Sequence, residues 1–206
     1  MTKTANERRA LTADVGLRRA MRTVALLNFG YFGIEFTVAS IIGSVALFAD
    51  SVDFLEDTAV NLLVLLALRW PPQRRALLGL ALGALLLAPG IATLHTAWMK
   101  LGMPAAPPAL PLSLTGLGAL AVNLSCALLL SRWRAAAGSL TRAAFLSARN
   151  DAIANVAIIV AGLLTAVTVS PWPDLVVGLG ILLLNLDATR AVWTAAHREY
   201  RGHRAA

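Results

Sequence analysis

The sequence predicts an all-α membrane protein with six transmembrane helices and with both chain termini on the cytosolic side. Of the 206 residues, 58% are hydrophobic and only 14% are charged, and the mean hydropathy is +0.70. Soluble domains usually have about a quarter of their residues charged. The chain also divides into apolar stretches of about 20 residues, the length that crosses a bilayer as a helix. Its basic residues gather at alternate ends of these stretches, which is typical of a multi-pass membrane protein.

Six apolar segments are separated by short breaks that end helices. A tight turn at Gly43-Ser44 follows the first, Pro71-Pro72 ends the second, and four prolines between 103 and 111 follow the third. We expect helices at 21–42, 44–68, 77–99, 112–130, 141–169 and 174–195. Residues 1–20 and 196–206 are then cytosolic tails, and residues 21–195 form the membrane domain.

The positive charges give the orientation. With the N-terminus in the cytosol, all but one of the 18 Lys and Arg residues fall in the two tails, in the second and fourth loops, or at the adjoining helix ends. The exception is Lys100. The net charge of +7 therefore orients the chain in a lipid bilayer and meets anionic lipid. Nucleic acid is not an expected partner, because no basic run is interleaved with aromatic residues. The composition, rich in Ala, Arg and Leu, favours a bacterial inner membrane.

Other classes of protein have little support in the sequence. The single cysteine, Cys126, excludes a disulfide within the chain and a cysteine-based metal site, and it reads as a small buried apolar residue. No nucleophile–base pair or HExxH-like motif indicates an enzyme. We expect no permanently bound cofactor.

The second apolar segment carries four carboxylates in its first half: Asp50, Asp53, Glu56 and Asp57. In a helix each residue advances about 100°, so Asp53 and Asp57 lie one turn apart on one face. Asp50 lies close to that face and Glu56 points to the side. Because ionised carboxylates are costly in hydrocarbon, this cluster indicates a cavity, a pathway or a bound cation. A divalent cation is the natural partner of aligned carboxylate oxygens.

The fifth segment repeats this polar spacing at i, i+4 and i+8. The two stripes are Asp53, Asp57 and Asn61 on the second segment and Ser147, Asp151 and Asn155 on the fifth. Matching stripes favour a facing arrangement in which oxygens converge on one ion. Simpler roles remain open for other polar residues. An asparagine in a span often joins helices, Glu35 could pair with a hydroxyl or a water, and Asp50 could interact with the helix dipole.

In their order along the chain, these residues resemble the cation diffusion facilitators, a family of proton-coupled exporters of divalent metals. The matching features are Asn28 with Glu35, Gly43-Ser44-Val45-Ala46-Leu47-Phe48-Ala49-Asp50-Ser51, Asp53-x-x-x-Asp57, Asn123, Ala144-x-x-Ser147-x-x-x-Asp151 and Asp174. The resemblance covers about residues 21–195. It implies the six-helix transmembrane domain of that family, working as a homodimer by alternating access, with a divalent metal and protons as substrates.

The resemblance also implies a ligand set. The metal ligands would be Asp53, Asp57, Asp151 and, at the fourth position, Ser147. Residues that would support the ligands or line the pathway are Asp50, Glu35, Asn61 and Asn155. Export of Zn²⁺, Mn²⁺, Co²⁺, Cd²⁺, Ni²⁺ or Fe²⁺ from the cytosol by proton antiport is the expected function.

Two departures from the family pattern affect this expectation. Ser147 stands where the family has His or Asp, so water, Asn155 or Asn150 could complete the site. An all-oxygen site favours harder ions such as Mn²⁺ or Mg²⁺ over Zn²⁺. We also expect this chain to lack the cytosolic metal-binding domain that usually follows the sixth helix in the family it resembles. The alternative is therefore a non-transporting or partner-dependent membrane subunit or sensor with an incomplete metal site. A plain channel would not explain two matched stripes.

Overall fold

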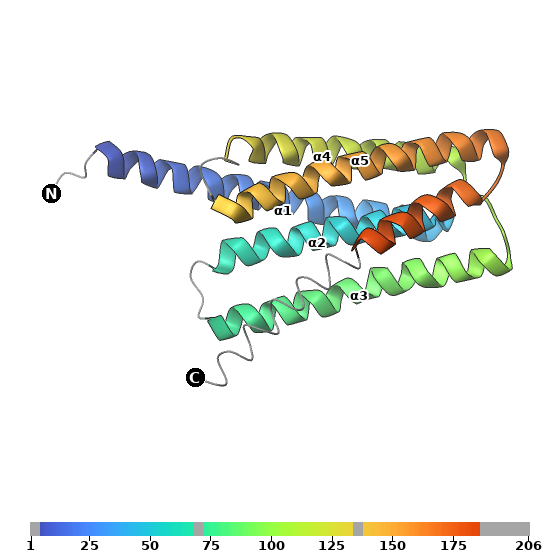
Figure 1. Cartoon of the computed structure of the whole chain (residues 1–206), viewed down its shortest axis with the longest axis horizontal. Helices are drawn as coiled ribbons and strands as arrows, with labels where there is room; N and C mark the ends of the chain where they lie inside the picture. The colour runs from blue at the N-terminus through green and yellow to red at the C-terminus, as the bar shows by residue number, and fades with distance from the viewer. Residues whose placement is uncertain (1–4, 68–71, 134–137, 186–206) are drawn as a thin grey trace.

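The computed structural model describes residues 5–67, 72–133 and 138–185, and all the regular secondary structure in them is helical. The helices are α1 (Ala5–Ile42), α2 (Val45–Ala67), α3 (Pro72–Gly102), α4 (Ala109–Ser131), α5 (Gly138–Thr168) and a shorter helix, Trp172–Asn185. Consecutive helices run in opposite directions (Figure 1). An all-α chain is thus confirmed, and the expected helix end at 186–195 lies outside the described residues.

Three helices in the described part of the chain are long and apolar enough to cross a membrane. They are Val15–Ile42, Ala109–Ser131 and Ser147–Thr168. Helix α2 is as long as α4 but carries the four carboxylates. The chain is an integral membrane protein by these helices, while six spans and cytosolic termini stay predictions.

Helix α1 begins at Ala5, well before the expected start at residue 21. The expected N-terminal tail is thus partly a continuation of the first helix. Residues 5–20 contain no proline and are rich in Ala, Arg and Leu, which are strong helix formers. The helix can therefore continue through them without interruption. Helix α3 begins at Pro72, a residue type that suits the first helical position because its missing N–H would have no partner there.

Helix α2 lies at the centre of the molecule. It contacts α1, α3, α4 and α5. Helix α4 also packs against α1 and α5, and α3 packs against α2 at the edge of the bundle (Figure 1). The helix Trp172–Asn185 packs near the start of α2, where Val45, Ala97 and Leu175 form one apolar cluster. Residues of α2 are therefore the ones best placed to meet side chains from several helices.

The bundle exposes large apolar side chains and buries several polar ones among its apolar core residues. Ile41, Leu128 and Val167 expose 78%, 70% and 83% of their surface. By contrast, Asn28 and Asn155 are fully buried. A soluble protein rarely exposes apolar surface on this scale, whereas hydrocarbon solvates it at no cost. The arrangement therefore supports a lipid environment around the bundle.

The turn between α1 and α2 confirms the predicted break at Gly43-Ser44. Gly43 has φ +64°, and the Ser44 N–H donates to the Ala39 carbonyl at 3.2 Å, which is the bond that closes a helix ending in a left-handed glycine. The Ser44 hydroxyl then accepts a hydrogen bond from the Leu47 N–H at 3.1 Å. Ser44 is therefore the N-cap of α2, a position that favours serine.

Asp174 joins three helix ends at this turn. Its carboxylate accepts hydrogen bonds from the Ser44 hydroxyl at 2.5 Å and from the N–H groups of Val45 and Ala46 at 2.9 and 3.2 Å. Lys100, near the end of α3, forms a 2.7 Å ion pair with it. We call these groups the Asp174 junction. Asp174 is fully buried, although the sequence placed it at the edge of a span.

The Asp174 junction explains two features of the sequence. Lys100, the one basic residue outside the predicted cytosolic regions, has a buried carboxylate as its partner. Gly178 lies one turn after Asp174, where an added Cβ would come within 2.6 Å of the Ala46 nitrogen. The absence of a side chain at Gly178 thus lets this helix approach the start of α2 closely enough for Asp174 to reach it.

We predict that Asp174→Asn strongly destabilises the protein, because Lys100 would be left buried without a counter-charge. The expected loss is roughly 3–5 kcal/mol, which would lower the Tm of the detergent-solubilised protein by about 10 °C. Thermal unfolding followed by intrinsic tryptophan fluorescence measures it. The double variant Asp174→Asn/Lys100→Met should recover part of this loss. An unchanged Tm in Asp174→Asn would show that the ion pair carries no stability.

Candidate functional site

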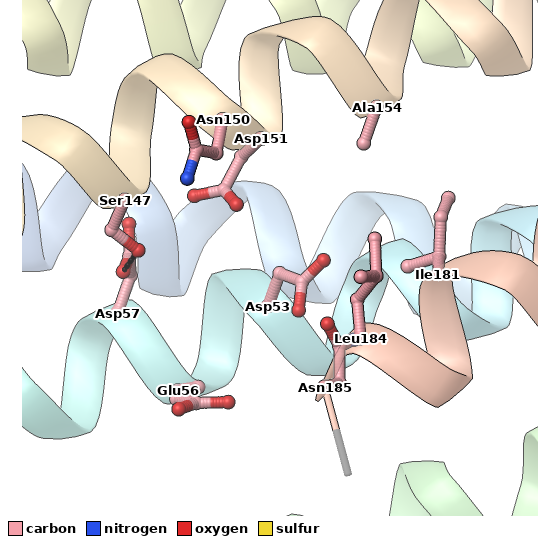
Figure 2. Close-up of a pocket in the computed structure, with 10 residues that line it drawn as sticks. All are labelled: Asp53, Glu56, Asp57, Ser147, Asn150, Asp151, Ala154, Ile181, Leu184 and Asn185. Atoms are coloured by element: carbon pink, nitrogen blue, oxygen red, sulfur yellow. Dashed lines mark hydrogen bonds between the residues drawn. The ribbon is translucent and has the colours of Figure 1, made fainter. Parts of the chain in front are cut away.

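A cavity of about 300 Å³ lies between α2, α5 and the helix Trp172–Asn185. Its lining residues are Asp53, Glu56, Asp57, Ser147, Asn150, Asp151, Ala154, Ile181, Leu184 and Asn185 (Figure 2). The predicted ligand positions Asp53, Asp57, Ser147 and Asp151 therefore all line one cavity. No Lys, Arg or His is among its lining residues in the described part of the chain.

The prediction that the two polar stripes face each other is confirmed at one direct contact. The Ser147 hydroxyl on α5 donates to the Asp57 carboxylate oxygen Oδ1 on α2 at 3.0 Å. Figure 2 shows Asp151 one turn further along α5, over the stretch of α2 between Asp57 and Asp53. Because α2 is an unbroken helix from Val45 to Ala67, Asp53 and Asp57 are held one turn apart, as their spacing predicted.

Asp57 also accepts a hydrogen bond through its second carboxylate oxygen. Asn28 of α1 donates its amide to the other carboxylate oxygen, Oδ2, at 3.3 Å. The Cys126 thiol of α4 donates in turn to Asn28 Oδ1 at 3.4 Å. A bound asparagine keeps its amide oriented when its oxygen also has a partner. Helices α1, α4 and α5 thus together fix the direction of one carboxylate on α2, and only 8% of Asp57 is exposed.

Four residues predicted to support the site do not line the cavity. Asn61 donates its amide to the Asp57 main-chain carbonyl at 2.8 Å, so it supports the backbone of a cavity residue. Asn155 is fully buried, and neither of its amide atoms has a partner among the described residues. Glu35 and Asp50 are also fully buried with no hydrogen-bond partner in the described part of the chain.

Two cavity residues were missed or misplaced by the sequence analysis. Glu56 was expected to point to the side of its helix, but it lines the cavity, because the cavity extends around α2 further than a single face. Asn185 lines it too and donates its amide to the Ala49 carbonyl at 3.3 Å. An isolated asparagine in an apolar helix was the available signal for Asn185.

The cavity gathers negative charge with little to balance it. Its donors to Asp57 are neutral groups, and uncompensated carboxylates in a low-dielectric interior are unfavourable. Carboxylate and amide oxygens of this kind are ligands for hard and borderline divalent cations. No three His, Cys, Asp or Glu side chains among the described residues are close enough together to hold a metal ion. Sharing one ion would therefore require side-chain rotation or a movement of α5 relative to α2.

Comparison with known protein families agrees with this arrangement. The model of the cation efflux transmembrane domain matches residues 21–196, which include the turn at Gly43, the cavity residues and the Asp174 junction. A search of curated proteins found no match to this chain. Because the matched region covers most of the sequence, the chain belongs to the cation efflux family, the cation diffusion facilitators, and contains that family's transmembrane domain.

Proposed function

We propose that this protein exports a divalent metal cation from the cytosol in exchange for protons, by alternating access. The single observation that supports this most strongly is the cavity lined by Asp53, Asp57 and Asp151 and by no basic side chain among the described residues. The family match makes the chain a cation efflux domain. The metal, the proton coupling and the alternating access are the parts that we propose.

Proton exchange follows from the chemistry of such a cavity. A metal ion bound by Asp57 and Asp151 requires them to be ionised, so protons and metal compete for the same oxygens. When the metal leaves, the carboxylates face one another without a counter-charge, and uptake of protons relieves their repulsion. A cavity that alternates between the two sides of a membrane would thereby carry metal in one direction and protons in the other.

The donor set favours an oxygen-coordinated substrate. Ser147, Asn150 and Asn185 supply neutral oxygens beside the carboxylates, and no His or Cys lines the cavity in the described part of the chain. Such ligands suit Mn²⁺ better than Zn²⁺, which prefers nitrogen and sulfur. We therefore rank Mn²⁺ first among the divalent metals to be tested. We further propose that the protein works as a homodimer in a bacterial inner membrane.

The alternative function is a non-transporting or partner-dependent subunit or sensor. The observation that favours it is the hydrogen bond from Ser147 to Asp57. At the position of the fourth ligand the chain has a neutral hydroxyl, and this hydroxyl is already bonded to one oxygen of a predicted ligand. Ser147 is therefore the residue at which the two functions can be separated.

We predict that Asp57→Ala and Asp151→Ala each abolish metal-driven proton flux, because each removes a charged ligand from the cavity. The measurement uses proteoliposomes with a trapped pH-sensitive dye, to which Mn²⁺, Zn²⁺, Co²⁺, Cd²⁺, Ni²⁺ or Fe²⁺ is added singly. Ser125→Ala, at an exposed serine of α4, is the control and should keep the flux. Wild-type flux in either aspartate variant would rule out the proposed ligands.

We predict that Asn28→Leu weakens metal binding without abolishing transport. Asn28 orients Asp57 through its 3.3 Å hydrogen bond, and loss of a group that orients a ligand typically costs about 10–100-fold in metal affinity. The concentration of metal at half-maximal flux should rise, while the maximal flux stays near that of the wild type. A lower maximal flux at unchanged half-saturation would assign Asn28 a different role.

We predict that Ser147→His increases the flux of Zn²⁺ relative to Mn²⁺, because imidazole is a far better ligand for zinc than a hydroxyl. The same proteoliposomes compare the two metals, with Ser147→Ala as the control for loss of the hydroxyl. If the wild type transports no metal and Ser147→His or Ser147→Asp gains transport, the alternative function is correct and the natural site is incomplete.

A further inference from the structure

The interior of the bundle holds a second pair of carboxyl groups that is separate from the cavity. Glu35 of α1 and Asp50 of α2 are both 0% exposed. On either side of them α1 and α2 pack on each other, because the Tyr31 and Phe54 rings lie 5.0 Å apart and the Phe36 and Phe48 rings lie 5.5 Å apart. In this antiparallel register Glu35 and Asp50 lie opposite each other on the two helices. Neither is among the residues that line the cavity.

No donor in the described part of the chain compensates this pair. All four carboxyl oxygens of Glu35 and Asp50 lack a hydrogen-bond partner there. Tyr31 lies one turn before Glu35 on α1, but its hydroxyl donates to the Thr115 carbonyl on α4 at 2.6 Å. Asp57, in contrast, accepts hydrogen bonds from Asn28 and Ser147.

The charged and titratable groups that face the pair do not neutralise it. They are Tyr31 on α1, Asp53 on α2 and, more remotely, Asp151 on α5. All three groups are acidic or phenolic, so they add negative charge or none. Two neighbouring ionised carboxylates in such a place would repel each other, and no donor among the described residues reduces the cost.

We propose that Glu35 and Asp50 form a proton-binding site in which one proton is shared between the two carboxyl groups. A protonated carboxyl is a donor as well as an acceptor, so one proton supplies the hydrogen bond that the pair otherwise lacks. It also reduces the buried charge from two to one. The site takes a proton, is distinct from the metal cavity, and lies between helices that the cavity does not join.

The position of the pair connects it to the proposed exchange. Asp50 lies three residues before Asp53 on α2, and Asp53 lines the cavity. The pair thus lies about one helical turn along α2 from the cavity, and we assign the proton it holds a role in the proton side of the proposed exchange. This role rests on the proposed function, whereas the proton site itself does not.

The first test detects the proton directly. Infrared spectra of the metal-free protein in lipid at neutral pH should contain a C=O band of a buried protonated carboxyl group. We expect Glu35→Gln to remove this band and Asp50→Asn to remove or shift it. Glu7→Gln, which changes a glutamate outside the predicted spans, is the matched control and should leave the band unchanged. A band that persists unaltered in both Glu35→Gln and Asp50→Asn would overturn the proposal.

The second test separates proton coupling from metal binding. In proteoliposomes, Glu35→Gln should lose flux driven by a pH gradient but keep exchange of metal for labelled metal, which needs no net proton movement. Equal loss of both would assign Glu35 to the metal site and overturn the proposal. So would a lower number of metal ions bound per chain in equilibrium dialysis with Mn²⁺. If Glu35→Gln fails to fold, Asp50→Asn provides the same comparison.

The two proposals can fail independently. A wild-type protein that moves no metal would refute the proposed export. The infrared test of the Glu35–Asp50 pair would still decide whether the proton site exists. Conversely, if the wild type transports metal but neither variant changes the infrared band, the proposed export is supported and the separate proton site is refuted.

Discussion

The main physical constraint on this structure is that α2, a helix with four carboxylates, lies inside an apolar bundle. Each carboxylate of α2 needs a donor, a cation or a proton, because lipid and apolar side chains offer none. The solution differs along the helix. Asp57 receives neutral donors from α1 and α5, whereas Asp50 is enclosed with Glu35 and receives none from the described residues. The central place of α2 among the other helices is what brings these different partners within reach.

The need for a donor, a cation or a proton also distinguishes Asp57 from the buried pair Glu35 and Asp50. Hydrogen bonds such as those that Asp57 accepts from Asn28 and Ser147 favour the ionised form of a carboxylate, which is the form that the proposed metal binding requires. A carboxyl group with no donor is better suited to hold a proton than to release it. The bundle thus offers two kinds of acidic environment within a few turns of one helix. The proposed exchange of a metal ion for protons would use both kinds.

Much of the fold and part of the site could be predicted from the sequence. The turn at Gly43 follows from glycine chemistry, and the shared cavity of Asp57 and Asp151 follows from the i, i+4 spacing on two apolar helices. The ion pair of Lys100 with Asp174 could not be predicted in this way, because its members are 74 residues apart. Local spacing carries no information on which distant helix ends meet. The lack of donors around a buried carboxylate is likewise a property of the packed bundle and leaves no pattern in the sequence.

The Asp174 junction also has a consequence for biogenesis. Lys100 is synthesised well before Asp174, so a growing chain must carry this lysine into the membrane region while its partner is still unmade. Until the helix that carries Asp174 is made, Lys100 lacks its counter-charge, and the Val45 and Ala46 N–H groups lack the acceptor that they have in the folded protein. Arrival of Asp174 satisfies both needs at once. The last described helix therefore completes contacts of segments that were synthesised earlier.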